Sequence, residues 1–186
     1  SAAYNGTFVL CAPRRAACAV RGETPTMHPM LSIAVKAARR AGNIINRGAR
    51  ELDLLTVTTK GPKDFVSEVD RQAESAIVET LLDAYPDHAI LAEEGTAKGA
   101  NAEAENVWII DPLDGTTNFL HGYPEYAVSI AVLRDGEPVA AVVYDVPGDE
   151  LFTARAGGGA FLNGERCHVS HITDPQRALI GTGFPF

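Results

Sequence analysis

The sequence predicts an α+β fold in which helices come first and strands follow. Apolar residues recur at helical spacing from Leu31 to Ile45 and again from Ala73 to Leu81. After residue 124 the pattern changes to three apolar runs, 127–133, 139–144 and 151–154, separated by short turns, which is typical of a β-meander. With 186 residues, the chain is long enough to form one good hydrophobic core.

The first 26 residues differ from the rest of the chain. Residues 1–26 combine small side chains with scattered arginines and show no sustained period. Such a composition is compatible with a targeting leader, but the apolar patch is short and precedes the arginines. We therefore expect a disordered, non-native extension at 1–26 and a domain that spans 27–186.

Two helices are expected next. The first begins at Pro29, because the first helical turn accepts proline, and continues through Gly48. The second begins with Asp70 as its N-cap and ends near Ala84. The inward positions of the two helices are predicted to be Leu31, Val35, Ala38, Ile44, Ile45, Ala73, Ile77, Val78 and Leu81.

The remaining segments are expected to form strands and loops. Residues 60–65 contain glycine and proline and predict a loop, and the glycine-rich stretch 156–170 predicts a connection with short strands. Apolar or β-branched runs predict strands at 54–58, 89–92, 107–110, 127–133, 139–144, 151–154 and 178–182. Trp108 is expected in the core. His121, His168 and His171 are expected to be surface or structural residues, because no paired nucleophile accompanies them in the sequence.

Composition limits the classes of function. The net charge of -8 argues against nucleic-acid binding driven by bulk charge. No apolar run approaches the roughly 20 residues that a transmembrane helix needs, so no membrane contact is expected. The three cysteines are odd in number and lack zinc-site spacing. We therefore expect a reducing, cytoplasmic location without a disulfide framework.

Carboxylates gather at the ends of apolar segments. They are Asp70, Glu93, Glu94, Asp111 and Asp114. Such groups must be solvated or paired, and no basic cluster of matching size lies near them in the sequence. A divalent cation would relieve their repulsion, and an all-oxygen donor set suits Mg²⁺, which also accepts phosphate oxygens.

The segment NVWIIDPLDGTTNFLHGYP, residues 106–124, holds two of these carboxylates. Gly115 permits close backbone approach, and Thr116 and Thr117 are predicted to cap a short helix through Phe119. A helix N-terminus presents free N–H groups to an anion such as phosphate. A plain turn with helix-capping aspartates is the alternative, because Asp-Pro and Asp-Gly are common in turns.

Three motifs resemble the inositol monophosphatase family. WIIDPLDGTTNFLHGYP is similar to its first signature, D-P-[IL]-D-G-T-x-N-F followed by a proline. DFVSEVD at 64–70 resembles the family segment that ends in a metal-linked aspartate, and ILAEEG at 90–95 resembles its Glu-Glu segment. MHPMLSIAVKAARRAGNII and GTGFPF look like the bacterial branch.

The resemblance implies a role for each matching residue. Glu93, Asp111 and the Leu113 carbonyl would bind a first Mg²⁺, Asp111 and Asp114 a second, and Glu93 with Asp70 a weaker third. Thr116 would hydrogen-bond the attacking water, with Asp70 behind it, so that Thr116, Asp70 and Glu93 form the catalytic group. The substrate contacts would come from Asp114, Gly115, Thr116 and Thr117. Glu94 would lie behind the ligands, and Lys60 near a loop that closes on the site.

The resemblance also implies the fold and the reaction. The fold would be the layered αβαβα sugar-phosphatase fold with its C-terminal layers truncated, because the second family signature, W-D-x-A-A-G, is not in the sequence. The reaction would be Mg²⁺-dependent, lithium-sensitive hydrolysis of inositol 1-phosphate by a homodimer, through a metal-activated water. The given chain would then be inactive.

Other functions stay open. Fructose 1,6-bisphosphate, histidinol phosphate and 3′-phosphoadenosine nucleotides are alternative substrates, because relatives that act on them share these motifs. A partnership with RNA polymerase or antitermination factors is an alternative of a different class.

Overall fold

The computed structural model describes residues 28–52, 62–92 and 104–178. Compact unit Thr24–Arg166 contains the helices and almost all of the sheet, and a second unit includes residues 167–178. In the second unit Asp174 accepts a hydrogen bond from the Gln176 backbone N–H at 3.0 Å and so begins the 3₁₀ turn η2, Pro175–Arg177. The predicted strand at 54–58, Lys60 and residues 1–26 lie outside the described residues, as does nearly all of the predicted strand at 178–182.

The element order confirms helices followed by strands. The helices are α1 (Pro29–Leu52), α2 (Pro62–Ala84) and α3 (Thr116–Leu120). The strands are β1 (Ala89–Ala92), β2 (Asn106–Asp114), β3 (Ala127–Arg134), β4 (Glu137–Asp145), β5 (Glu150–Arg155), β6 (Gly159–Leu162) and β7 (Glu165–Cys167). The architecture is α+β, as predicted: one mixed seven-stranded sheet, in sequence order, packed with helices.

The start of α2 corrects a prediction. Asp70 lies in the interior of α2 and is not its N-cap, because the helix begins eight residues earlier, at Pro62. Residues 62–65 are therefore helical instead of the predicted loop. Pro62 fits this start, since proline is tolerated where the backbone N–H has no helical partner.

The sheet is a meander with one parallel pair. β1 runs parallel to β2, with Ala92 opposite Ile110, and each later pair for which a register is defined is antiparallel. The turn between β3 and β4 uses Asp135 and Gly136, whose φ angles of 51° and 82° fit the left-handed turns that join twisted hairpins.

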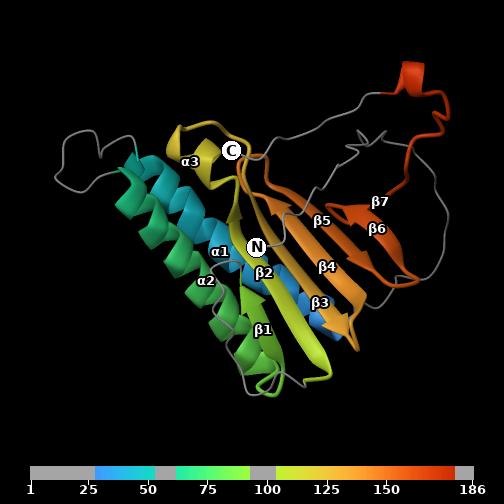
Figure 1. The fold of residues 1–186 in the computed structure, drawn as a ribbon, viewed down its shortest axis with the longest axis horizontal. Helices are drawn as coiled ribbons and strands as arrows, with labels where there is room; N and C mark the ends of the chain where they lie inside the picture. Colours follow the sequence, from blue (N-terminus) through green and yellow to red (C-terminus); the bar gives the residue numbers. More distant parts are fainter. Residues whose placement is uncertain (1–27, 53–61, 93–103, 179–186) are drawn as a thin grey trace. The chain divides into compact units, whose positions relative to one another are not determined.

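Helices α1 and α2 pack side by side and cover one face of the sheet (Figure 1). α1 contacts β3 and β4, and α2 contacts β2 and α3. The core between these layers includes Ala38, Ile45, Ile77, Leu81, Trp108, Ile110, Ile130, Val132 and Val142. Trp108 is fully buried, as predicted, and its indole N–H donates to Nδ1 of His88 at 3.0 Å. Burial of His88 lowers the pKa of its imidazole, so the neutral acceptor form is favoured.

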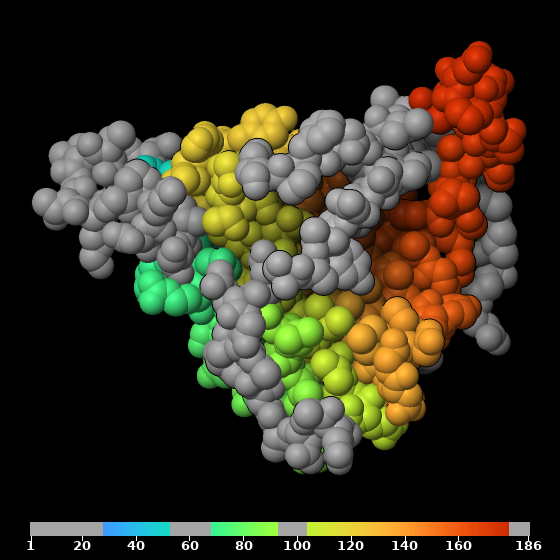
Figure 2. Space-filling view, viewed as in Figure 1, coloured from blue at the N-terminus to red at the C-terminus, as the bar shows by residue number. Residues whose placement is uncertain are grey.

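The opposite face of the sheet is apolar as well. One row of register partners crosses β1 to β6 and consists of Leu91, Ile109, Ala131, Ala141, Ala154 and Ala160. Leu91 and Ile109 are 48% and 40% exposed. Figure 2 views the sheet from this side, and atoms of the green to orange strands are visible at the surface.

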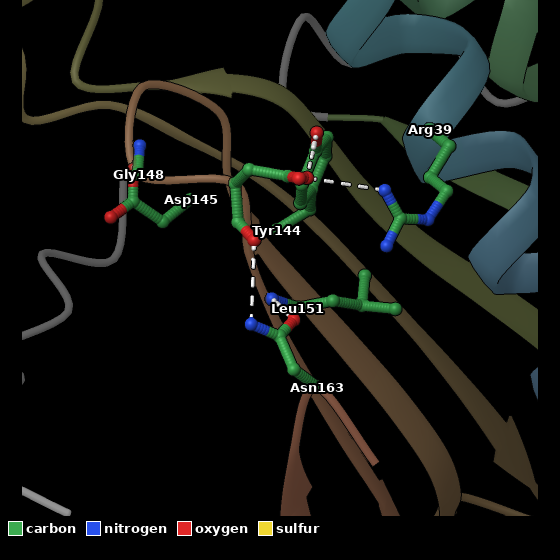
Figure 3. A network of polar contacts seen from close by, with 7 residues as sticks. Arg39, Tyr144, Asp145, Gly148, Leu151 and Asn163 are labelled. Atoms are coloured by element: carbon green, nitrogen blue, oxygen red, sulfur yellow. Dashed lines mark hydrogen bonds and ion pairs between the residues drawn. The ribbon is translucent and has the colours of Figure 1, made fainter.

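A polar network joins α1 to the turn between β4 and β5 (Figure 3). The Tyr144 hydroxyl donates to Asp149 Oδ1 at 2.8 Å, and Arg39 Nη1 donates to the same oxygen at 3.2 Å. The guanidinium of Arg39 also lies 5.3 Å from the centre of the Tyr144 ring. These two hydrogen bonds lower the pKa of the Asp149 carboxyl, and burial raises the pKa of the Tyr144 hydroxyl.

Candidate active site at the β2–α3 junction

Two of the five predicted carboxylates, Asp111 and Asp114, lie where β2 passes into α3. β2 extends beyond the predicted end at Ile110 and includes Asp111 to Asp114. The pairing with β3 is interrupted between Asp111, opposite Ser129, and Asp114, opposite Ala127. Proline has no N–H for a sheet hydrogen bond, so Pro112 fits this interruption. The break leaves Leu113 buried and Asp114 exposed.

Local hydrogen bonds shape the turn. The Leu113 backbone N–H donates to Asp111 Oδ1 at 3.2 Å, and Thr116 Oγ1 donates to the Leu113 carbonyl oxygen at 3.0 Å. Since a carbonyl has two lone pairs, the Leu113 oxygen keeps one acceptor position after this bond. A hydroxyl has only one proton, so Thr116 Oγ1 offers acceptor lone pairs to any further neighbour.

Gly115 begins α3 and corrects a second prediction. Its φ is 93°, in the left-handed region, and it forms the N-cap without a side-chain hydrogen bond. Thr116 and Thr117 are therefore the first residues of the helix and not its caps, although both are exposed as a substrate contact requires. A Cβ on Gly115 would lie 2.7 Å from the Glu125 carbonyl oxygen, so the position has no room for a side chain.

The loop after α3 is fixed by a residue that the sequence analysis missed. Asn118 donates from Nδ2 to the Glu125 carbonyl oxygen at 2.7 Å and thereby closes residues 119–124 into a loop. Phe119 packs edge-on against Tyr126, with ring centres 5.2 Å apart. The signal was weak, because no local rule pairs an asparagine with a carbonyl seven residues later.

The other predicted site residues are placed only in part. Asp70 lies on α2, the helix that contacts both β2 and α3. Glu93 and Glu94 lie outside the described residues, although β1 ends at Ala92, whose register partner Ile110 immediately precedes Asp111. Within the described ranges, no three His, Cys, Asp or Glu side chains converge as a metal group. The described junction itself brings together Asp111, Leu113, Asp114, Gly115, Thr116 and Thr117.

Three predicted surface histidines, His121, His168 and His171, are exposed, as expected. Among the described helices, none is both long and apolar enough to cross a membrane.

Comparison with known proteins identifies the family. The sequence model of the inositol monophosphatase family matches residues 26–186. The chain belongs to the inositol monophosphatase family. The Nus factor SuhB of Pseudomonas aeruginosa is 53% identical to it over 161 residues, which are 86% of this chain and 59% of the relative.

Solved structures of the same family agree with this assignment. The extragenic suppressor protein suhB from Bartonella henselae aligns with a TM-score of 0.69 and 41% identity, over 78% of this chain and 56% of that one. An inositol monophosphatase from Anabaena (Nostoc) sp. PCC 7120 aligns with a TM-score of 0.66 and 37% identity, over 77% and 50%. The chain thus spans between 50% and 59% of the length of these family members.

Proposed function

We propose that this chain carries part of the catalytic site of a Mg²⁺-dependent phosphomonoesterase that hydrolyses inositol 1-phosphate to inositol and phosphate. The observation that carries the proposal is the β2–α3 junction, where two carboxylates and the Leu113 carbonyl lie within four consecutive residues, 111–114. Membership in the inositol monophosphatase family, and the structural likeness to an inositol monophosphatase from Anabaena, support the reaction and its substrate.

The junction suits Mg²⁺ because its donors are all oxygen atoms. The exposed Asp114 forms no ion pair with any described lysine or arginine, so its charge is available to a cation. We assign Glu93, Asp111 and the Leu113 carbonyl to one ion, Asp111 and Asp114 to a second, and Glu93 with Asp70 to a weaker third. When bound, Mg²⁺ supplies charge neutralisation for the phosphoryl oxygens and lowers the pKa of water.

The chain's own groups would orient the reactants. Thr116 Oγ1 commits its proton to the Leu113 carbonyl, so it can accept a hydrogen bond from the attacking water and hold it in place. Asp70 is assigned to the same water, and Glu93 completes the catalytic group. Backbone N–H groups at the start of a helix have no helical acceptor, so Gly115, Thr116 and Thr117 can donate to a phosphate. Asp114 completes the assigned substrate contacts.

The test compares two variants that lose the same charge. We expect Asp114→Asn to weaken Mg²⁺ binding at least about tenfold, measured by calorimetry, because even a residue behind the ligands costs about 10–100-fold in metal affinity. Any release of phosphate from inositol 1-phosphate by the unaltered chain is expected to fall with it. Asp135→Asn, in the β3–β4 turn, is the control and should bind Mg²⁺ like the unaltered chain. Equal Mg²⁺ affinity in both variants would contradict the proposal.

Substrate choice is the finer part of the proposal. Fructose 1,6-bisphosphate, histidinol phosphate and 3′-phosphoadenosine nucleotides belong in the same assay, because the family motifs of this chain do not separate them from inositol 1-phosphate. Inhibition by lithium, a homodimeric state and a cytoplasmic location are further expectations from the family resemblance.

A second candidate function is partnership with the transcription antitermination machinery. The observation that favours it is the 53% identity to a protein named a Nus factor. Capture of RNA polymerase or antitermination factors by the Asp114→Asn variant, at the level of the unaltered chain, would show a role separate from phosphatase chemistry.

A further inference from the structure

The outer face of α1 carries an unusual concentration of positive charge. This helix has one acidic residue, Glu51, and five basic ones: Lys36, Arg39, Arg40, Arg47 and Arg50. At 3.6 residues per turn, the five basic positions fall within about 100° of the helix circumference. The buried positions of α1, among them Ala34, Ala41 and Ile45, occupy the opposite side. We call the five basic residues the α1 basic face.

Two of the five charges are neutralised within the molecule. Arg39 pairs with Asp149 in the network of Figure 3, and Arg40 pairs with Glu79 on α2. The other three, Lys36, Arg47 and Arg50, are exposed and form no ion pair with any residue that the structure describes. They extend over about 21 Å of helix at 1.5 Å per residue.

Stability does not account for this pattern. Like charges three or four residues apart, such as Lys36 with Arg40 and Arg47 with Arg50, destabilise a helix by about 0.2–0.5 kcal/mol per pair. The chain as a whole has a net charge of -8, so acidic residues are abundant in the sequence. Few of them are placed on α1, where they would separate the like charges. The α1 basic face therefore lowers the stability of the helix itself, and we interpret it as a surface for an anionic ligand.

The chemistry of the face favours a phosphate backbone. Of the three members that form no ion pair with a described residue, two are arginines, Arg47 and Arg50, whose guanidinium groups can form paired hydrogen bonds with phosphate oxygens. The other α1 residues within the arc are Pro29, Ser32 and Asn43, so the face lacks the aromatic or large aliphatic anchors that form the dry centre of a protein interface. It likewise lacks the apolar groups that would enter a bilayer. Phosphate contacts need charge alone.

We propose that the α1 basic face binds the phosphate backbone of a nucleic acid without reading its bases. The inference stands apart from the phosphatase proposal, because it uses none of the residues at the β2–α3 junction. Without an aromatic side chain on this face, no base can stack there, so binding is independent of sequence. The net charge of -8 repels a nucleic acid and therefore weakens this binding. We expect a salt-sensitive affinity with a Kd of about 10⁻⁴–10⁻⁶ M at physiological salt.

The test uses a fluorescein-labelled single-stranded RNA of mixed sequence and measures its anisotropy at several salt concentrations. The triple variant Lys36→Gln/Arg47→Gln/Arg50→Gln should bind at least about tenfold more weakly at low salt. Its plot of log affinity against log salt should be shallower by about 2, since each lost phosphate contact removes about 0.7. The matched control Arg134→Gln/Arg166→Gln/Arg177→Gln removes the same charge from three exposed arginines outside α1 and α2 and should bind within about twofold of the unaltered chain.

Three results would overturn the proposal. The unaltered chain could fail to bind the RNA at low salt, or both triple variants could lose affinity equally, which would mean that bulk charge and not this face governs binding. Tighter binding of labelled poly-glutamate than of RNA, lost in the first triple variant, would assign the face to an acidic protein instead. Circular dichroism of each variant serves as the control for folding and should show that the helices are retained.

Discussion

At the scale of single residues, the site depends on a conformation that side chains resist. Gly115 has a φ of 93°, and its backbone passes close to the Glu125 carbonyl oxygen. Left-handed backbone costs a residue with a Cβ about 1–2 kcal/mol, and forcing atoms into a filled space costs about 1–3 kcal/mol more. The turn that presents Asp114 therefore requires glycine on both counts.

Gly115→Ala is accordingly expected to destabilise the chain by about 3 kcal/mol in urea unfolding. Gly122→Ala is the matched control, because Gly122 also has a positive φ, 66°, but nothing lies within 4 Å of its Cβ position. Gly122→Ala should cost only the free energy of placing a residue with a Cβ in left-handed backbone, about 1 kcal/mol. If the two substitutions cost the same, the contact with Glu125 does not constrain the turn.

At the scale of elements, α1 lies unusually close to β4. A Cβ at Gly42 would meet the Tyr144 ring, 2.9 Å from Cδ1. The ring cannot easily move aside, because its hydroxyl donates to Asp149 and Arg39 lies over its face. The absence of a side chain at Gly42 thus sets how closely the helix approaches the sheet.

Two opposing effects decide the outcome of Gly42→Ala. Helix propensity alone would stabilise α1 by about 1 kcal/mol, whereas overpacking costs about 1–3 kcal/mol, and we expect the second to win. The melting temperature should fall by a few degrees, about 2–4 °C for each kcal/mol in a chain of this length. Asn43→Ala, on the exposed side of the same helix, should raise it slightly. An increase for both variants would show that Tyr144 has room to move.

The sequence predicted the elements well where an apolar repeat extends over many residues. It predicted them less well where a single proline or glycine sets the end of an element. The helix through Ile45 and the strands of the meander follow from repeated apolar spacing, which many residues specify together. The start of α2 at Pro62, the extension of β2 through Pro112 and the left-handed Gly115 each depend on one residue whose conformation is set by tertiary packing. The carboxylates of the candidate site were predicted as a set, but their geometry depends on that same turn.

At the scale of the whole sheet, two apolar faces have different environments. Ile110 is 1% exposed beneath the helices, whereas its neighbour Ile109, on the opposite face, is 40% exposed. The two residues are chemically identical and adjacent in β2, so they separate the effect of burial from that of strand propensity. The helix-covered face should carry most of the stability of the sheet.

We therefore expect Ile110→Ser to destabilise the chain by about 3–5 kcal/mol, because it removes a fully buried side chain and leaves a cavity. Ile109→Ser should cost about 1 kcal/mol or less, mostly through strand propensity. Urea unfolding measures both costs. The exposed face should also bind a hydrophobic dye such as ANS, and the double variant Leu91→Ser/Ile109→Ser should bind less dye while it remains folded. Equal unfolding costs at positions 109 and 110 would mean that both faces are buried to the same extent in solution, and unchanged dye binding in the double variant would place the apolar surface elsewhere.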